Sequence, residues 1–304
     1  MLMMKLKYAL AFLFLAFVCS LNAQIRYGFK TGLNFAHFNG PSEMDDAGKD
    51  LESWSNITGF HIGATFAYQF TDNYSLRAEL LYSKRGATYT FDRQSYRTFR
   101  YDNGSTMSFG NSRYLVNINN SYIDIPVTAV ARWGDFEISG GAYVGFLISS
   151  VGDGSLRYSG KTAPPQNYTI KDVNTGKDEL VFNLNYNYRK DNPGEGGDDV
   201  GAVIAELSSA PLRLEMPGTL GAYYDYTEDR GSLFNGLDYG LIGGVSYYLS
   251  SSLYAGVRLQ YGMADVTNSD ADVSKARLNE DGTFIYRDDK DKNFSIQVSV
   301  GFSF

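Results

Sequence analysis

Charged side chains of both signs recur at alternate positions along several segments of the sequence, and each segment is apolar on its opposite face. In a β-strand alternate side chains point to the same side of the sheet, so these charges would share one face. The set comprises Lys30, Arg77, Arg132 and Arg258 against Glu79, Asp124, Glu137 and Asp238, with His61 and Tyr143 among them. If that face lines a narrow barrel, the charges need partners, because an unpaired buried charge carries a large desolvation cost. The pattern predicts either an ion-pair plug or a narrow path for ions or small solutes, and the sequence leaves both open.

Residues suited to enzymatic catalysis are scarce. The chain holds one Cys and two His, which are His37 and His61. The acids that follow His37, namely Glu43, Asp45 and Asp46, do not define a Ser-His-Asp arrangement by their spacing. A base at His37 would suit an enzyme at the rim of a barrel, whereas His61 is better explained as a packed interior residue. We therefore expect no enzymatic activity and no cofactor.

Acidic residues gather in two places outside the alternating segments. One group is Asp191, Glu195, Asp198 and Asp199, and the other is Asp288, Asp289 and Asp291. Carboxylates are the ligands that Ca²⁺ prefers, but neither group has the spacing of a twelve-residue calcium loop with its central Gly. The sequence favours a solvated acidic surface, assigns no metal ligand and leaves the binding of divalent cations open.

Eight segments alternate between apolar and polar residues with the period of a β-strand. They span residues 25–35, 60–70, 76–83, 123–133, 136–148, 237–249, 253–261 and 293–304. In the last segment Ile296, Val298 and Val300 lie on one face, and Gln297 and Ser299 lie on the other. A shift by one residue would exchange the two faces, so the register of such a strand is well defined.

The connections between these segments alternate in length. Short turns lie at 71–73, 134–135 and 250–251, and long loops lie at about 37–57, 87–120, 150–235 and 265–292. An even number of strands with short turns at one end and long loops at the other is typical of an outer-membrane β-barrel. The polar face is rich in Gly, Ser, Asn, Gln and Thr, which suits a crowded interior better than the water-facing side of a soluble barrel. We predict an all-β protein, an eight-stranded antiparallel transmembrane β-barrel with long extracellular loops, in the cell outer membrane.

Composition and the N-terminal sequence agree with this location. The 304 residues include 24 Tyr, 20 Phe and 32 Gly but only 7 Pro, and the net charge of −7 argues against a nucleic-acid partner. Lys5 and Lys7 precede a short apolar run that ends before Ala23, which is the order of a secretory signal peptide. We predict a signal peptide at 1–23 and a barrel at 24–304 that contacts outer-membrane lipid. A lipoprotein anchored through Cys19 is the alternative.

The third long loop contains a pattern of its own. Residues 180–188 alternate again, with Phe182, Leu184, Tyr186 and Tyr188 on one side. They predict a strand above the membrane, paired with either 155–159 or 168–171. Its aromatic face could contact a partner or cover the barrel mouth, so the 150–235 loop is where an envelope protein would bind.

Several strand motifs resemble a known family. The motifs are YGFKTGLNF (27–35), LRAELLYS (76–83), YIDIP (122–126), GGAYVG (140–145), DYGL (238–241) and GFSF (301–304). They are similar to those of the PorT-like outer-membrane β-barrel proteins, a porin-family relationship that implies a scaffold and no particular chemistry. We expect a barrel with a side-chain-filled lumen that acts through its extracellular loops in surface binding or envelope assembly. A small porin-like channel for ions or small solutes is the alternative.

Overall fold

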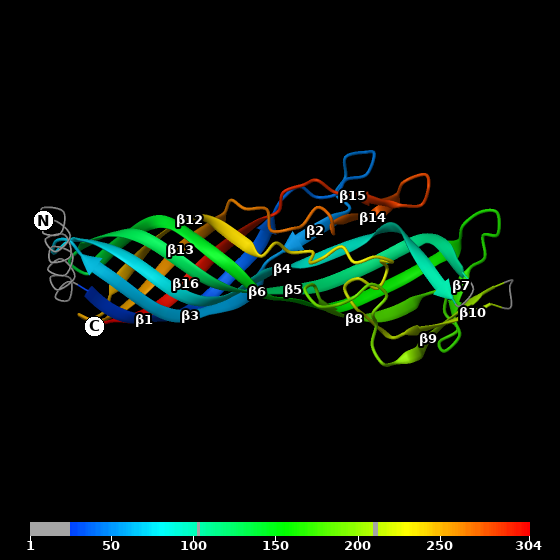
Figure 1. Ribbon diagram of the computed structural model, residues 1–304, viewed down its shortest axis with the longest axis horizontal. Helices are drawn as coiled ribbons and strands as arrows, with labels where there is room; N and C mark the ends of the chain where they lie inside the picture. Colours follow the sequence, from blue (N-terminus) through cyan, green and yellow to red (C-terminus); the bar gives the residue numbers. More distant parts are fainter. Residues whose placement is uncertain (1–24, 102–103, 209–211) are drawn as a thin grey trace, which may run out of the picture.

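The computed structural model describes residues 25–101, 104–208 and 212–304, and within them eight strands close into a ring (Figure 1). In order around the ring they are β1 (Ile25–Asn39), β3 (Ile57–Gln69), β4 (Tyr74–Tyr101), β5 (Gly104–Trp133), β6 (Phe136–Thr162), β12 (Leu237–Tyr248), β13 (Leu253–Gly262) and β16 (Lys292–Ser303). Each strand pairs antiparallel with the next, and β16 pairs with β1 to complete the ring. All eight predicted strands are therefore confirmed.

The predicted signal peptide, residues 1–23, lies outside the described residues. Within the described ranges, no helix has the length and apolar character needed to cross a membrane.

The outer surface of the ring carries a continuous apolar belt. Side chains alternate along each strand, so that in β16 Val298 is 44% exposed while its neighbour Ser299 is 3% exposed. Other exposed members of the belt are Phe29, Leu33, Phe66, Leu80, Val127, Val144, Leu241, Val257, Leu259 and Val300. At the short turns Tyr74 packs edge-on against Trp133, where an aromatic girdle is expected. Closure of the ring pairs every strand edge, as lipid requires because it offers no hydrogen bonds.

Three neighbouring strands are far longer than the rest. β4, β5 and β6 contain 28, 30 and 27 residues, whereas the other five contain 10 to 15. A strand needs only about 9–11 residues to cross a bilayer, and Figure 1 shows the three long strands continuing well beyond the ring. The expectation of a loop at 87–120 is therefore wrong for the described residues, since β4 and β5 stay paired up to Tyr101 and Gly104. The loop expected from 150 likewise begins only after Thr162.

The polarity of the long strands reverses along their length. In β4 the outward side chains are apolar up to Tyr82 and then become polar at Lys84, Thr88 and Thr90. On the inward side the charged residues give way to buried Ala87, Tyr89 and Phe91. The strand thus passes from an apolar outer surface with a polar interior to a polar surface with an apolar interior. The prediction of a loop at 87–120 assumed that the apolar residues stay on one face along the whole strand, which is not the case here.

The part of the chain beyond the ring forms a folded unit, which we call the distal lobe (described residues among 40–56, 84–121, 149–235 and 263–291). Its main sheet adds β2 (Glu52–Ser55), β8 (Leu180–Asn187) and β11 (Thr219–Leu220) to the long strands. β7 (Ile170–Asp172), β9 (Val200–Leu207) and β10 (Arg213–Pro217) form a second sheet, and β14 (Val273–Leu278) pairs with β15 (Phe284–Tyr286). Of the two pairings predicted for 180–188, the structure shows the first, because β8 pairs with residues 151–158 of β6.

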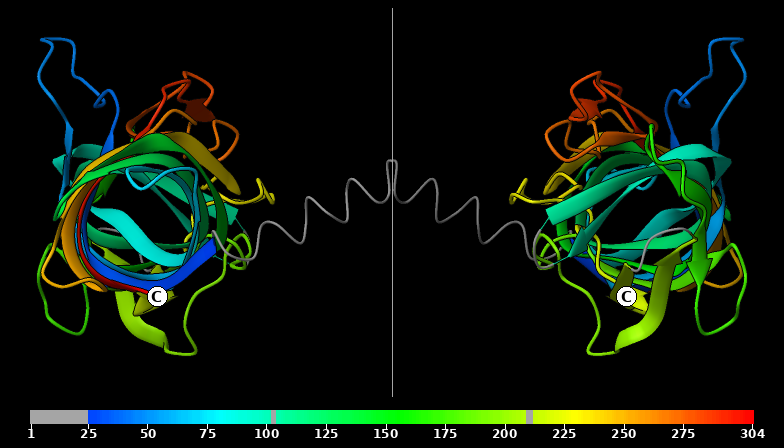
Figure 2. Two further views of the ribbon diagram at one scale, coloured as in Figure 1. Left: turned by 90° about the vertical axis from the view of Figure 1, so that its left-hand side faces the viewer. Right: turned by 90° about the vertical axis from the view of Figure 1, so that its right-hand side faces the viewer.

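The distal lobe has its own hydrophobic core. Phe91, Leu156, Tyr158 and Phe182 are completely buried within it, and they come from β4, β6 and β8 of the main sheet. Figure 2 shows the ring end-on, with the 40–51 loop and the β14–β15 hairpin on one side and the second sheet on the other. The segments that connect the barrel strands at this end therefore pack together into one folded lobe next to the barrel.

Candidate functional site

Near the short turns the lumen contains a buried ion pair between β4 and β6. Arg77 donates from Nη1 and Nη2 to the two carboxylate oxygens of Glu137 at 2.8 and 2.7 Å. Tyr248 donates its hydroxyl to Glu137 Oε2 at 3.1 Å. Bidentate pairs of this kind combine a strong interaction with a fixed geometry, so they hold these strands in register.

Arg132 lies at the same end of the lumen. It is half-buried, and its Nε donates to the carbonyl of Gly134 at 2.9 Å. Its guanidinium lies 3.5 Å from the centre of the Tyr248 ring. Arg132 is the cross-strand partner of Glu137, and it lines the cavity at the short turns together with Arg77 and Glu137. The structure therefore places it beside the lower charges of the lumen.

In the middle of the lumen one carboxylate is shared between two cations. Glu79 accepts from Arg258 Nη1 at 2.7 Å and lies 3.5 Å from Lys30 Nζ. Arg258 also donates from Nε to Gln297 at 2.8 Å. His61 lies nearby, fully buried, with Nδ1 2.7 Å from Asn34 Oδ1 and Nε2 3.0 Å from Ser299 Oγ. Each of these groups is used in packing the interior, as expected for His61.

At the top of the lumen an arginine that the sequence reading missed joins two predicted acids. Arg85 donates to Asp124 at 2.9 and 3.0 Å and to Asp238 at 3.0 Å, and it is almost completely buried. Its guanidinium lies 4.0 Å from the centre of the Tyr122 ring. Gly145 makes room for this pair, because a Cβ there would clash with both Asp124 and Arg85. The signal was present, since Arg85 continues the inward positions of Arg77 and Glu79 at alternate residues.

Tyr143 completes this upper group. Its hydroxyl donates to Asp238 Oδ2 at 2.9 Å, and the amide of Asn293 donates to the same oxygen at 2.9 Å. The free space around the charged residues is small, with cavities of about 10 Å³ beside Glu79 and about 40 Å³ at the short turns. The interior is thus packed with side chains, as expected in an eight-stranded barrel.

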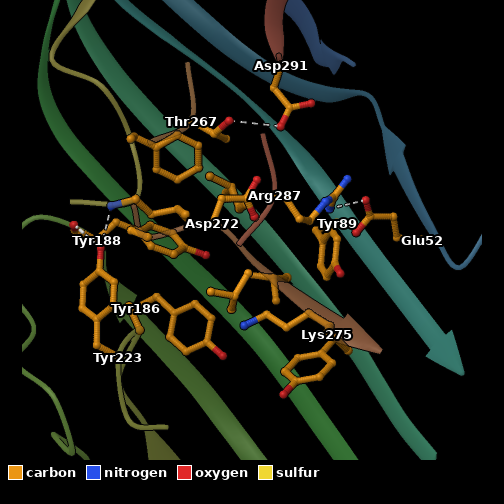
Figure 3. Close-up of a pocket in the computed structure, with 18 of the residues that line it drawn as sticks. Glu52, Tyr89, Tyr186, Tyr188, Tyr223, Thr267, Asp272, Lys275, Arg287 and Asp291 are labelled. Atoms are coloured by element: carbon orange, nitrogen blue, oxygen red, sulfur yellow. Dashed lines mark hydrogen bonds and ion pairs between the residues drawn. The ribbon is translucent and has the colours of Figure 1, made fainter. Parts of the chain in front are cut away.

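A larger cavity lies in the distal lobe (Figure 3). It has a volume of about 90 Å³ and is bordered by β2, β4, β5 and β8 and by the segments 222–234 and 267–291. Its aromatic lining comprises Trp54, Tyr89, Tyr114, Tyr186, Tyr188, Tyr223, Tyr226 and Phe234. A single water needs about 10–15 Å³, so this cavity is large enough for a small molecule. We call it the distal pocket.

Charged groups occupy one side of the distal pocket. Glu52 accepts from Arg287 Nη1 at 2.7 Å, and the other end of Arg287 forms an ion pair with Asp289. Lys275 extends its ammonium group toward the tyrosines in Figure 3. Burial raises the pKa of Tyr89 well above its ordinary value, so its hydroxyl remains a hydrogen-bond donor. The pocket therefore combines flat apolar surfaces with donors and acceptors.

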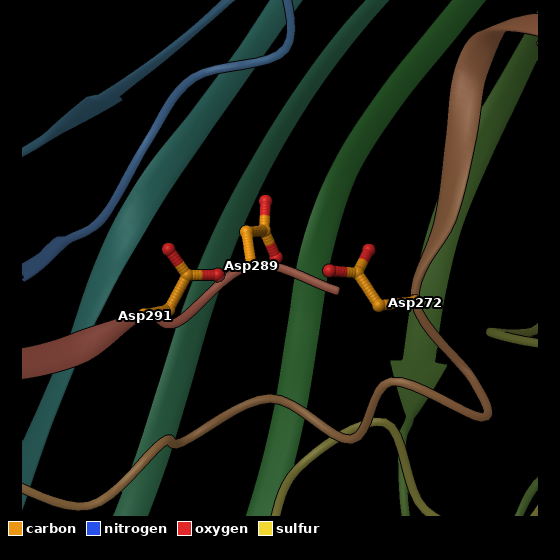
Figure 4. A group of neighbouring side chains, drawn as sticks. All are labelled: Asp272, Asp289 and Asp291. Atoms are coloured by element: carbon orange, nitrogen blue, oxygen red, sulfur yellow. The ribbon is translucent and has the colours of Figure 1, made fainter. Parts of the chain in front are cut away.

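Three carboxylates meet at the acidic side of the pocket (Figure 4). One oxygen from each of Asp272, Asp289 and Asp291 lies within 4.8 Å of the others. Burial, reinforced by the nearby Asp289 carboxylate, raises the pKa of both Asp272 and Asp291 to about 7. The sequence had singled out Asp289 and Asp291 together with Asp288, but Asp288 is exposed and outside the group. Asp272 carried no signal because it lies 17 residues away in the sequence.

The other acidic group of the sequence serves local structure. Asp191 accepts from the backbone amides of Asn187 and Ala222, and Glu195 accepts from Asn192. Asp199 accepts from Thr219. These three carboxylates stabilise the local turns. His37 lies against the ring of Phe294 at the rim of the barrel, with 5.1 Å between the ring centres.

The family model described as "Outer membrane protein beta-barrel domain" matches residues 20–268. No curated protein matches the chain. Among solved structures, the chain is similar to Ail, the attachment invasion locus protein of Yersinia pestis, at 9% identity, covering 92% of this chain and 99% of that chain with a TM-score of 0.32.

Two further solved structures have comparable similarity. The outer membrane protein OprG from Pseudomonas aeruginosa is 10% identical, with 92% of this chain and 95% of that chain covered and a TM-score of 0.32. The outer membrane protease OmpT from Escherichia coli is 10% identical, with 92% and 97% covered and a TM-score of 0.27.

Proposed function

This chain belongs to the outer membrane protein β-barrel domain family, and from that premise we propose that it is a surface-binding protein that acts through its distal lobe. The observation that carries the proposal is the contrast between the two ends of the molecule. The lumen is filled by ion pairs, with cavities of only about 10 and 40 Å³, whereas the distal lobe has a core and a pocket of about 90 Å³. Such pockets with apolar walls and a few polar groups are typical of ligand sites.

The proposal includes an orientation in the outer membrane. We place both termini and the short turns in the periplasm and the distal lobe outside the cell, because short turns face the periplasm in barrels of this class. Delivery by a signal peptide cleaved after Ala23 and a PorT-like subfamily are parts of the same proposal, supported by the N-terminal pattern and by the strand motifs.

The lining of the distal pocket favours a small hydroxylated ligand such as a sugar. Rings such as Trp54 and Tyr188 offer flat apolar surfaces, and carboxylates such as Glu52 accept hydrogen bonds from hydroxyl groups. A sugar presents both an apolar face and hydroxyl donors. The ligand would enter from the outside without passing through the barrel.

Assembly with an envelope protein is the second candidate, and the second sheet of the distal lobe favours it. β10 and β7 are the outer strands of that sheet, and among the described residues each pairs only with β9. Exposed strand edges can accept a further strand from a partner. This sheet lies in the 150–235 segment, where the sequence predicts the partner surface.

The filled lumen predicts that the refolded protein does not conduct ions. In a planar bilayer we expect no stepwise current from the wild-type protein or from Glu79→Gln, because Glu79 is buried between Lys30 and Arg258. Protease protection confirms insertion in the same preparation. A steady current in the wild type that changes in Glu79→Gln would instead favour the small porin-like channel.

Ligand binding in the distal pocket is measurable through Trp54. The chain has two Trp, so Trp133→Phe leaves Trp54 as the single reporter and keeps an aromatic ring at the girdle. We expect a saturable change in Trp54 fluorescence on titration with glucose, galactose or maltose. The matched variant Trp133→Phe/Ala222→Phe narrows the pocket, since Ala222 lines it, and should abolish the change. An equal response in both variants, or none to any sugar, contradicts the proposal.

A further inference from the structure

The ammonium group of Lys275 is an unpaired cation in the wall of the distal pocket. Lys275 belongs to β14, is half-buried and lines the pocket. Within the described ranges its side chain forms no ion pair. Figure 3 shows the ammonium group directed into the pocket, toward the tyrosines. A cation in this position is available to a ligand.

The other charged groups of the pocket lie apart from Lys275. Glu52 and Arg287 form an ion pair, with 2.7 Å between Oε1 and Nη1. Burial raises the pKa of Asp272 and Asp291 to about 7, and Arg287 opposes this effect. In Figure 3 the carboxylates of all three acids are separated from the Lys275 ammonium group. The pocket is therefore polarised, with carboxylates at one end and an ammonium group at the other.

A hydroxyl donor lies at the same end as Lys275. Tyr186 lines the pocket, and in Figure 3 its ring is on the side away from the acids. Burial raises the pKa of the Tyr186 hydroxyl well above its ordinary value, so the hydroxyl stays protonated and can donate. Hydrogen bonds to an ionised acceptor are roughly twice as strong as those between neutral groups. An ammonium group and a phenolic hydroxyl at one end of the pocket therefore suit an anion.

We infer that the ligand of the distal pocket is an acidic sugar, with its carboxylate bound by Lys275 and Tyr186 and its hydroxyl groups facing Asp272 and Asp291. The inference rests on the proposed function, because it names the class of sugar that the same pocket binds. A carboxylate carries a single charge, which one ammonium group balances. A phosphate group carries about −1.5 to −2 charges at neutral pH, so it would leave excess negative charge in a pocket that already contains acids.

The acids at the opposite end are compatible with an anionic ligand. Because the pKa of Asp272 and of Asp291 is raised to about 7, each is partly protonated at neutral pH. A protonated carboxyl group can donate a hydrogen bond as well as accept one, so it can pair with a sugar hydroxyl in either direction. The carboxylate of the ligand lies at the far end, beside Lys275. Protonation and distance both reduce the repulsion.

The experiment compares two sugars that differ at one carbon atom, in the protein carrying Trp133→Phe, where Trp54 is the single reporter. Glucuronate has a carboxylate where glucose has a hydroxymethyl group. At neutral pH we expect glucuronate to bind at least about tenfold more tightly than glucose, because hydrogen bonds to a charged group contribute this much affinity. Glucose-6-phosphate, the sugar phosphate, should bind less tightly than glucuronate.

Two lysine variants identify the group that selects the carboxylate. Lys275→Met keeps the length of the side chain and removes its charge, so the affinities for glucuronate and glucose should become about equal. Lys290→Met removes the same charge from an exposed lysine that does not line the pocket, and should keep the preference for glucuronate. A response to glucose that persists in Lys275→Met shows that the pocket is intact.

Three results would overturn the inference. They are equal affinities for the two sugars in the Trp133→Phe protein, a preference for glucuronate that survives Lys275→Met, and loss of glucose binding together with glucuronate binding in that variant. Equal affinities leave the proposed sugar-binding function standing, whereas no response to either sugar contradicts that function as well. The two failures are therefore distinguishable.

Discussion

Replacing Arg85 with methionine is expected to lower the free energy of unfolding by about 3–5 kcal/mol. The guanidinium is the shared partner of Asp124 and Asp238, and both carboxylates are almost fully buried. Removing it leaves two negative charges close together in the lumen with no cation between them. Chemical denaturation of the protein in lipid vesicles measures the change.

Two further variants define the origin of this effect. Arg113→Met makes the same substitution in an ion pair with Asp92 whose side chains are 64% and 48% exposed, and it should cost no more than about 1 kcal/mol. Combining Arg85→Met with Asp124→Asn and Asp238→Asn removes the unpaired charges and should restore much of the stability. A loss for Arg85→Met no larger than that for Arg113→Met would show that the buried triad does not hold the strands together.

Val298→Arg is expected to prevent assembly of the barrel. Val298 is exposed on the outer belt and pairs with Leu33 of β1 and Val257 of β13, which are also exposed and apolar. A cation at the midplane of a bilayer costs about 2–4 kcal/mol. The measurement is the inserted fraction after refolding into vesicles, judged by protection from protease.

The matched control makes the same substitution at an exposed valine outside the lipid-facing belt. Val200 is 68% exposed at the start of β9 in the distal lobe, so Val200→Arg should insert like the wild type. Ser299→Arg is expected to be severe as well, because Ser299 is buried and hydrogen-bonded to His61. Normal insertion of Val298→Arg would mean that this face of β16 does not meet lipid.

The eight strands of the ring were predictable because lipid imposes a simple rule on them. Each crossing must place apolar side chains outside and smaller or polar ones inside, as Val298 and Ser299 illustrate. The prediction extended only as far as the rule applies. Beyond Tyr82 the outward side chains are polar and the inward ones are apolar. The alternation continues there with its two faces exchanged, and a rule based on lipid predicts a loop.

The lumen was predictable for a similar reason, and its exceptions lie where the strand environment changes. Glu79 and Asp124 are in mid-strand, and alternation alone places them inside. Arg85 lies at the point of polarity reversal, where the apolar positions of the local pattern change sides. Arg132 lies beside a turn, where its Nε donates to the carbonyl of Gly134 and its guanidinium stacks on Tyr248. Position relative to the two ends of the barrel is information that a local pattern does not contain.

The distal pocket could not be predicted from local patterns at all. Its lining comes from segments as far apart as Trp54, Tyr186 and Asp291, which only the folded lobe brings together. No spacing rule connects these positions. Asp272 could not be predicted for the same reason, because only the pairing of β14 with β15 brings it close to Asp289.

The unequal lengths of the strands give the molecule a stiff side and a compliant side. β4, β5 and β6 pass from the barrel into the distal lobe as paired strands, with one register shift between Ser121 and Tyr122 of β5, so no linker separates the lobe from the barrel on that side. On the opposite side the short strands β1, β12, β13 and β16 are connected to irregular segments. These segments form one wall of the distal pocket. If the pocket opens, we therefore expect the 265–291 segment to move while the long strands stay in place.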